Sequence, residues 1–308
     1  MTNKEKHEFK ATFKRDLKQF TETLKEYVST ETGEWTVKGF IDIYKNIYTI
    51  SSDTKIVSKI LEIHIFPQLL AFADSIGYSI VLAEKQNWYP DLSFVKKDNE
   101  EVKFAVDLKT TYREPTYPGH INGFTLGSHG KYFKDRTSTK NIQYPYSEYT
   151  GHFCMGIIYT RADFDEARET GVYAVHELQP EYGAGRNIGA RAVTDVKHLK
   201  SITSVIKDFD FFVAEKWEIA SENQGSSNTA NIGSITSIED LKKGNGIFAQ
   251  LGEQWFDEYW INYDMAMMVA DGTTKRITKL SDFLAFKGRD DLKKKIVARM
   301  TKRKADAK

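Results

Sequence analysis

Apolar residues near the N-terminus recur at the spacing of an α-helix. Phe9, Phe13, Leu17, Phe20 and Leu24 are three or four residues apart, so they fall on one face of a helix over residues 4–28. A second helix can be capped by Ser52 or Asp53, and we expect Pro67 to break or bend it before it ends at Gly77. Its core-facing positions are predicted to be Ile56, Ile60 and Ile63, with Val57 and Leu61.

Alternating and continuous apolar runs then predict strands. Strands are expected near residues 78–83, 91–96 and 102–109, with a fully buried strand at 152–159 and another at 211–220. The alternation over 101–109 is typical of a half-buried strand. A helix with an aromatic face follows at Trp255–Tyr263. This series of helix, strands and helix predicts one mixed α/β domain.

Composition adds few constraints. The formal net charge is +1, which gives no global indication of nucleic-acid binding, although lysines and arginines crowd the last sixteen residues. Cys154, the one cysteine, excludes a disulfide framework and a cysteine-rich zinc site, and its apolar surroundings predict an inert, buried thiol. We find no apolar run of about 18 residues and no signal-like start, so a cytoplasmic protein with no membrane segment is the expectation.

Two carboxylates and a lysine supply the candidate chemistry. Pro90-Asp91 is followed sixteen residues later by Asp107-Leu108-Lys109, on what read as neighbouring strands. Asp107 and Lys109 share a face because side chains alternate along a strand. Carboxylates can hold a hard divalent cation, and a lysine can stand beside the attacking water, as phosphodiester hydrolysis requires. The alternative is the solvated face of an amphipathic hairpin.

Glu62 is a third candidate acid, on the polar side of the second helix. It could complete the carboxylate set over the sheet edge beside Asp91 and Asp107. The alternative is a surface ion pair with Lys59, which would contribute only a few tenths of a kcal/mol. The pattern of residues does not choose between them.

Two polar segments could contact bases. The segment Gly225–Asn231 is rich in small residues and amides, and an asparagine pairs well with adenine in the major groove. Gln86-Asn87, just before the first aspartate, forms a second segment of this kind. As an alternative, both are simply flexible loops.

These pieces occur in one order, and that order resembles the EcoRV-like type II restriction endonucleases of the PD-(D/E)xK superfamily. The resemblance covers about residues 50–265 and is carried by separated segments: 51–62, 86–91, 106–112, 124–127, 140–145, 159–161 and 225–235. The chain departs from the family pattern at Ser227, which stands where the family has glycine, and at Ala230, which replaces threonine. Trp88 replaces a histidine.

The resemblance implies a fold and a set of roles. The fold would be a mixed β-sheet core flanked by helices, in a U-shaped homodimer around duplex DNA. Asp91, Asp107 and Glu62 would bind Mg²⁺, with Mn²⁺ able to substitute, and Lys109 would orient or activate the water. DNA contacts would come from Gly225, Ser226, Ser227, Asn228, Thr229, Ala230, Asn231, Gln86, Asn87, Lys55, Thr111, Thr125 and Lys140.

We therefore expect a Mg²⁺-dependent type II restriction endonuclease that cuts duplex DNA at a short palindrome. The family resemblance favours GATATC with a blunt central cut, and it implies a cognate DNA methyltransferase in the same cell. A repair or structure-specific nuclease, or a DNA-binding protein with a vestigial metal site, are the alternatives. The expected regions are 1–50 (N-terminal, helical and dimerising), 51–265 (catalytic and DNA-recognition core) and 266–308 (basic C-terminal).

Overall fold

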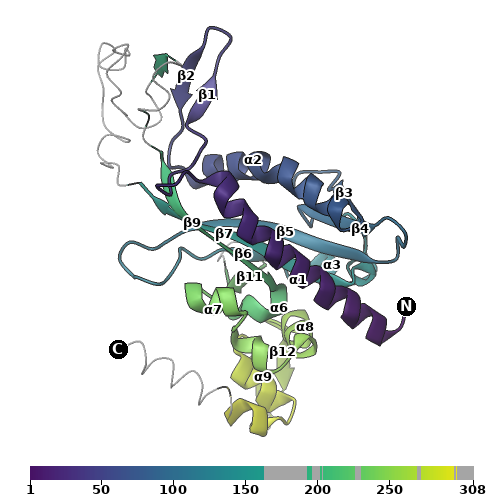
Figure 1. Ribbon diagram of the computed structural model, residues 1–308. Coiled ribbons are helices and arrows are strands. Elements are labelled where there is room, and N and C mark those ends of the chain that lie inside the picture. The colour runs from purple at the N-terminus through teal and green to yellow at the C-terminus, as the bar shows by residue number, and fades with distance from the viewer. Residues whose placement is uncertain are drawn as a thin grey trace.

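A mixed sheet of five strands forms the centre of the computed structural model (Figure 1). The structure describes residues 1–162, 193–195, 202, 204–225, 230–268, 272–294 and 296. The strand order is β3-β4-β5-β7-β9, in which β5 and β7 run parallel and the other neighbours antiparallel. Their bounds are β3 Tyr78–Leu82, β4 Leu92–Lys96, β5 Lys103–Tyr112, β7 Gly151–Arg161 and β9 Ile206–Glu215. The mixed α/β sheet core with flanking helices is confirmed.

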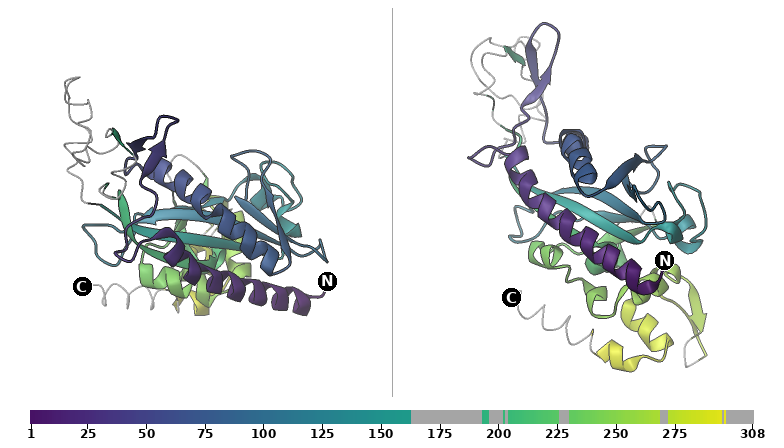
Figure 2. Two further views of the ribbon diagram at one scale, coloured as in Figure 1. Left: turned by 45° about the horizontal axis from the view of Figure 1, so that its top comes forward. Right: turned by 45° about the vertical axis from the view of Figure 1, so that its right-hand side comes forward.

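Two long helices cover one face of this sheet: α1 (Asn3–Val28) and α2 (Thr54–Ser75). The apolar stripe of α1 is buried in the same core cluster as the sheet, and the Phe13 ring stacks on Phe104 of β5 with centroids 4.2 Å apart. Figure 2 shows α1 lying along the sheet in both views. The predicted helix over 4–28 is confirmed, and its apolar stripe packs within its own chain.

The second helix differs from its prediction in two ways. It runs through Pro67 without interruption, and its buried stripe consists of Val57, Leu61, Ile65 and Leu69. Ile56 and Ile63 are instead 42% and 64% exposed. Both apolar sets recur at helical spacing, so periodicity alone could not say which one faces the sheet. The prediction that the isoleucines face the core was therefore wrong for these two.

By length and composition alone, α2 is apolar enough to cross a membrane, contrary to the expectation from sequence. One side of it nevertheless packs into the core with α1 and the sheet. A core helix of this kind passes the same test, so the feature is weak evidence for a membrane segment.

Elements from the middle and from the C-terminal part of the chain cover the other face of the sheet and build a second core. A three-stranded sheet, β10 (Ala220–Gln224), β11 (Asn231–Ser234) and β6 (Thr125–Ser128), lies there. It is joined by α3 Lys131–Lys134, η1 Tyr146–Glu148, α6 Lys216–Ile219, α7 Ile238–Lys243, η4 Ile247–Gln250, α8 Glu253–Ile261 and α9 Leu280–Phe286, with the hairpin β12 Ala266–Met268 and β13 Thr274–Arg276. The predicted aromatic helix corresponds to α8. Residues 297–308 of the basic region lie outside the described part.

The two cores explain one error of the sequence reading. Phe104, Val106 and Leu108 of β5 face the first core, whereas Ala105 belongs to the second. The strand is therefore buried on both faces, rather than half-buried. The predicted strand over 211–220 also ends early, because β9 stops at Glu215 and the short helix α6 intervenes before β10.

A small hairpin projects from this body (Figures 1 and 2). Strands β1 (Gly39–Ile41) and β2 (Asn46–Thr49) pair antiparallel, and β2 also pairs with β8 (Val193–Asp195). Several of its apolar side chains are exposed, with Ile43 at 88% and Tyr44 at 78%, whereas Ile47 is buried at 4%. Residues 29–50 are therefore not helical, although they fall within the region expected to be helical and dimerising.

Candidate active site

Asp91, which directly precedes β4, lies opposite Asp107 of the adjacent strand β5. In the antiparallel pair β4 and β5, Leu92 faces Val106, so continuing the register by one residue sets Asp91 opposite Asp107. The backbone N–H of Leu108 donates a 2.7 Å hydrogen bond to Asp91 Oδ2. Strand pairing therefore brings together two carboxylates that are sixteen residues apart in sequence.

Lys109 joins this pair from the same face of β5. Its Nζ lies 2.7 Å from Asp107 Oδ2, and the Asp107 side chain is only 6% exposed. The predicted same-face arrangement of Asp107 and Lys109 is thus present in the structure.

The electrostatics of the pair are asymmetric. Burial, together with the neighbouring charge of Asp107, raises the pKa of Asp91 to about 7. Burial would also raise the pKa of Asp107, but the charges of Lys109 and Lys216 outweigh it and lower that pKa. Although burial opposes it, the charge of Asp107 followed by that of Asp91 raises the pKa of Lys109. The site therefore holds two close carboxyl groups that do not ionise independently.

This arrangement fits a divalent cation. Among the described residues, Asp107 Oδ2 is fully buried and accepts no hydrogen bond of good geometry, so its contact with Lys109 is an ion pair only. Hard cations such as Mg²⁺ are bound by carboxylate oxygens, and one or two carboxylates commonly suffice. Asp91 and Asp107 are thus suited to hold such an ion.

Glu62 is not brought into one ligand set with the aspartates. Within the described ranges, no three acidic, histidine or cysteine side chains are grouped closely enough to bind a metal together. Glu62 Oε2 instead accepts a 2.7 Å hydrogen bond from Lys59, which is the ion pair considered as the alternative. The hydrogen bond that Lys59 donates to Glu62 raises the pKa of Lys59, and the charge of Asp91 also contributes. The metal-binding role of Glu62 stays a prediction.

A second lysine near the aspartates was not anticipated from the sequence. Lys216 begins α6, is 3% exposed, and stacks its Nζ 3.7 Å from the centroid of the Tyr89 ring. Burial lowers its pKa to about 8, and the negative charge of Asp107 opposes that shift. In the sequence, Lys216 follows a buried strand and precedes the apolar residues Trp217 and Ile219, and this pattern could have indicated that the lysine is buried.

The predicted DNA-contacting residues differ in their exposure to solvent. Lys55, Gln86, Asn87 and Lys140 are exposed, at the start of α2 and on loops. Thr111 is buried, at 4% exposure, and its hydroxyl donates to the carbonyl of Asn122. In this conformation Thr111 is therefore not a surface contact.

The candidate recognition segment joins β10 to β11. The N–H of Gly225 donates to the carbonyl of Asn231 (3.0 Å), and that of His129 to the carbonyl of Ala230 (2.9 Å). Gly225 packs so tightly that an added Cβ would lie 2.7 Å from the methyl carbon of Thr125. Gly225 and Ala230 are exposed, whereas Ser226, Ser227, Asn228 and Thr229 lie outside the described residues.

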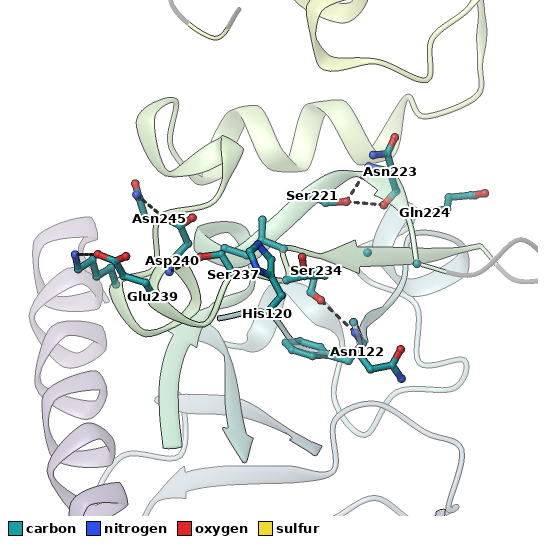
Figure 3. A pocket seen from close by; sticks show the side chains of 17 residues that line it. His120, Asn122, Ser221, Asn223, Gln224, Ser234, Ser237, Glu239, Asp240 and Asn245 are labelled. Carbon is teal, nitrogen blue, oxygen red and sulfur yellow. Dashed lines mark hydrogen bonds and ion pairs between the residues drawn. The ribbon is translucent and has the colours of Figure 1, made fainter. Parts of the chain in front are cut away.

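A polar pocket of about 980 Å³ opens beside this segment (Figure 3). It is lined by the amides Asn122, Asn223 and Gln224 and by the hydroxyls of Ser221 and Ser234. Several of these groups bond to one another, since Ser221 Oγ donates to the Asn223 carbonyl and Ser234 Oγ accepts from Phe124 N–H. Residues of β10 and β11, the strands that the candidate recognition segment joins, line part of this pocket.

Paired carboxylates and a lysine on the inner strands of a mixed sheet are suited to metal-dependent hydrolysis of a phosphodiester. Comparison with known proteins gives the family. The family model for restriction endonuclease EcoRV matches residues 31–185 and 182–288. The chain is also 31% identical over 260 residues to the type II restriction enzyme EcoRV of Escherichia coli, covering 84% of this chain and 94% of that enzyme. The protein belongs to the EcoRV restriction endonuclease family, and it is a site-specific deoxyribonuclease that acts on DNA.

Proposed function

We propose that this restriction endonuclease cuts duplex DNA with Mg²⁺ held by Asp91 and Asp107. The observation that carries the proposal is the pair of facing carboxylates with the ion-paired Lys109 beside it. Enzymes of this family generally depend on a divalent metal. The buried Asp107 Oδ2, whose contact with Lys109 is an ion pair rather than a hydrogen bond of good geometry, supports a cation there. Mn²⁺, which also prefers oxygen ligands, is expected to substitute.

The residues divide the work by their chemistry. A bound cation would supply charge stabilisation at the scissile phosphate. Asp91 is oriented by the N–H of Leu108, and Asp107 by its ion pair. Lys109, held protonated by Asp107, is suited to orienting the attacking water or donating to a phosphate oxygen rather than to accepting a proton. Glu62 could assist by giving up its ion pair with Lys59 and binding the cation instead.

Plasmid digestion tests the metal and the site together. Wild-type protein should convert a supercoiled plasmid to discrete linear fragments with Mg²⁺ and leave it intact with EDTA. Asp91→Asn should be inactive under both conditions. Cleavage in EDTA, or by the Asp91→Asn variant at the wild-type rate, would contradict the proposal.

For the target sequence, we propose GATATC cut bluntly at its centre. Support comes from the family resemblance of residues 225–235 and from the hairpin that presents this segment between β10 and β11. A central TA step is flexible, so bending it would cost less than bending a stiffer step, which gives specificity at base pairs that are hardly touched. Ser227 and Ala230 differ from the family pattern, and another six-base palindrome with a central TA step is the alternative.

Asn228 is the proposed reader of adenine within this segment. A bidentate contact of this kind discriminates by about 1–3 kcal/mol per base pair, and a two-fold dimer would make it twice. Asn228→Ala should therefore reduce cleavage of GATATC DNA by about a hundredfold or more. Asn223→Ala, at the neighbouring pocket, is the matched control and should reduce it far less. Equal rates for wild type and Asn228→Ala would remove Asn228 from base reading.

We further propose that the active form is a homodimer, because a two-fold protein matches a palindromic site and one active site per chain must serve two strands. The exposed apolar residues of the β1–β2 hairpin support a contact there, since large exposed apolar groups commonly mark interfaces. A cognate DNA methyltransferase in the same cell and a cytoplasmic location complete the proposal, since a restriction enzyme must spare the DNA of its own host.

A further inference from the structure

Lys216 is a buried cation at the base of the proposed metal site. It stands where β9 passes into α6, and only 3% of the residue is exposed. Its Nζ lies over the Tyr89 ring, which directly precedes Pro90 and Asp91. An added Cβ at Gly127 would come within 3.3 Å of that Nζ, so the ammonium also packs against the β6 backbone. Its position is thus fixed from two sides.

The turn that carries Lys216 is anchored from α1. Glu215 and Glu218 flank Lys216 and form a reciprocal capping box at the start of α6. Lys10 contacts Glu215 at 2.7 Å, and Lys14 contacts Glu218 at 2.5 Å. These ion pairs are partly buried, and α1 lies before the first residue of the family-model match. The flanking acids are therefore already paired with α1.

The charge of Lys216 is compensated mainly by Asp107, with a smaller contribution from Asp91. Its Nζ lies against the Tyr89 ring, and Asp107 is the acidic residue whose charge acts on it most strongly. Asp91 and Asp107 carry two negative charges when ionised, and Lys109 and Lys216 carry two positive ones. The formal charge of this buried group is then zero before any metal binds.

We propose that Lys216 is a resident counter-charge that weakens the binding of a divalent cation by the protein alone. This inference rests on the proposed metal site at Asp91 and Asp107. A cation entering the site is repelled by a fixed ammonium in a medium of low dielectric, where charges interact far more strongly than in water. The negative phosphate of bound DNA would offset that repulsion, so the cation is held firmly only when substrate is present. Lys216 is thus a positioning residue acting through the aspartates.

Calcium titration of the protein without DNA, at pH 7, tests this directly. Lys216→Met removes the charge but keeps the length of the side chain, and it should bind Ca²⁺ at least about tenfold more tightly than wild type. Lys216→Gln should shift the affinity in the same direction, and Lys216→Arg should keep the wild-type value. Lys103→Met is the matched control, because Lys103 also lies over a tyrosine ring (Tyr144, 5.2 Å) but away from the aspartates.

The outcome of these titrations distinguishes a counter-charge role of Lys216 from a purely structural one. A purely structural lysine would give weaker or unchanged Ca²⁺ binding when replaced, and that result in a variant with wild-type melting would overturn the proposal. Failure of both neutral variants to fold would assign Lys216 a structural role and overturn it as well. Asp107→Asn separates the premise from the inference: if it leaves Ca²⁺ affinity unchanged, the metal site itself is wrong. If it abolishes binding while Lys216→Met changes nothing, only the role of Lys216 is wrong.

Discussion

The ammonium of Lys109 lies 2.7 Å from the carboxylate of Asp107, two residues earlier on the same face of β5. The register of β4 against β5 adds Asp91 directly across from Asp107. Asp107 and Lys109 are therefore fixed on a paired strand, and Asp91 directly precedes one. Groups fixed in this way can be pre-organised before substrate arrives.

Replacing Asp107 should abolish cleavage without unfolding the protein. We expect Asp107→Asn to slow Mg²⁺-dependent cleavage by at least about a thousandfold, because the cation supplies several kcal/mol of charge stabilisation and each 1.4 kcal/mol is tenfold. Single-turnover cleavage and thermal unfolding measure the two effects. Asp98→Asn, an exposed aspartate just after β4, is the control. A variant at 107 that still cuts at the wild-type rate would remove Asp107 from the site.

Lys109 should separate chemistry from metal binding. Lys109→Met removes the group that orients water or phosphate, so the single-turnover rate should fall by about a hundredfold or more. Ca²⁺ affinity should not weaken, because a positive charge beside the carboxylates has been removed. Parallel titration and rate measurements check this division. Weakened Ca²⁺ binding with a wild-type single-turnover rate would show that Lys109 supports metal binding rather than the cleavage chemistry.

The exposed hairpin should govern assembly. Wild type should sediment as a dimer at micromolar concentration, and the double variant Ile43→Asp with Tyr44→Asp should sediment as a monomer with unchanged melting. These side chains are 88% and 78% exposed, so the change costs little within one chain. Met268→Asp, at an exposed methionine of β12, is the control. A wild-type monomer with and without DNA would refute the dimer, and a dimeric double variant would refute this contact.

Buried His152 should make stability fall in mild acid. Burial, with the charges of Lys216 and Arg136, holds its pKa well below the usual 6.5. The unfolded chain therefore takes up a proton first as the pH drops below about 6.5, which removes up to about 1.4 kcal/mol of stability per pH unit. The raised pKa of Asp91 has the opposite effect on stability, because the folded protein then binds the extra proton. The difference in pH dependence of stability between wild type and His152→Phe therefore isolates the contribution of the histidine. Denaturant unfolding between pH 7 and 5 should show a smaller loss in the variant. Equal slopes would show that His152 does not titrate as described, and exposed His7→Phe serves as control.

The sequence predicted the strands that carry Asp107 and the residues after Asp91, because alternation fixes which residues share a face. Asp107 and Lys109 follow from a period of two, and their pairing with Asp91 needs only that the neighbouring strands be antiparallel. The burial of Cys154 was equally predictable from its apolar run, and it is confirmed. Local pattern was sufficient in each case.

Other features depend on contacts that are distant in sequence. Ile56 and Val57 both belong to apolar stripes of α2, and only the packed position of the helix decides that Val57 is buried. At the end of β9, Glu215 forms ion pairs with Lys10 and Lys14, about two hundred residues earlier in the chain. Lys216 was missed for the same reason, because its partners come from β5 and from the residues before β4.

Mapping the ends of a digested plasmid tests the central claim most directly. A plasmid of known sequence that contains a single GATATC should be linearised once in Mg²⁺, and run-off sequencing should place both breaks between the central T and A. A second plasmid with that site changed to GAATTC, which lacks the central TA step, should remain uncut. Blunt ends at GATATC are the predicted result. Staggered ends, or cleavage at a site without a central TA step, would contradict the proposed specificity.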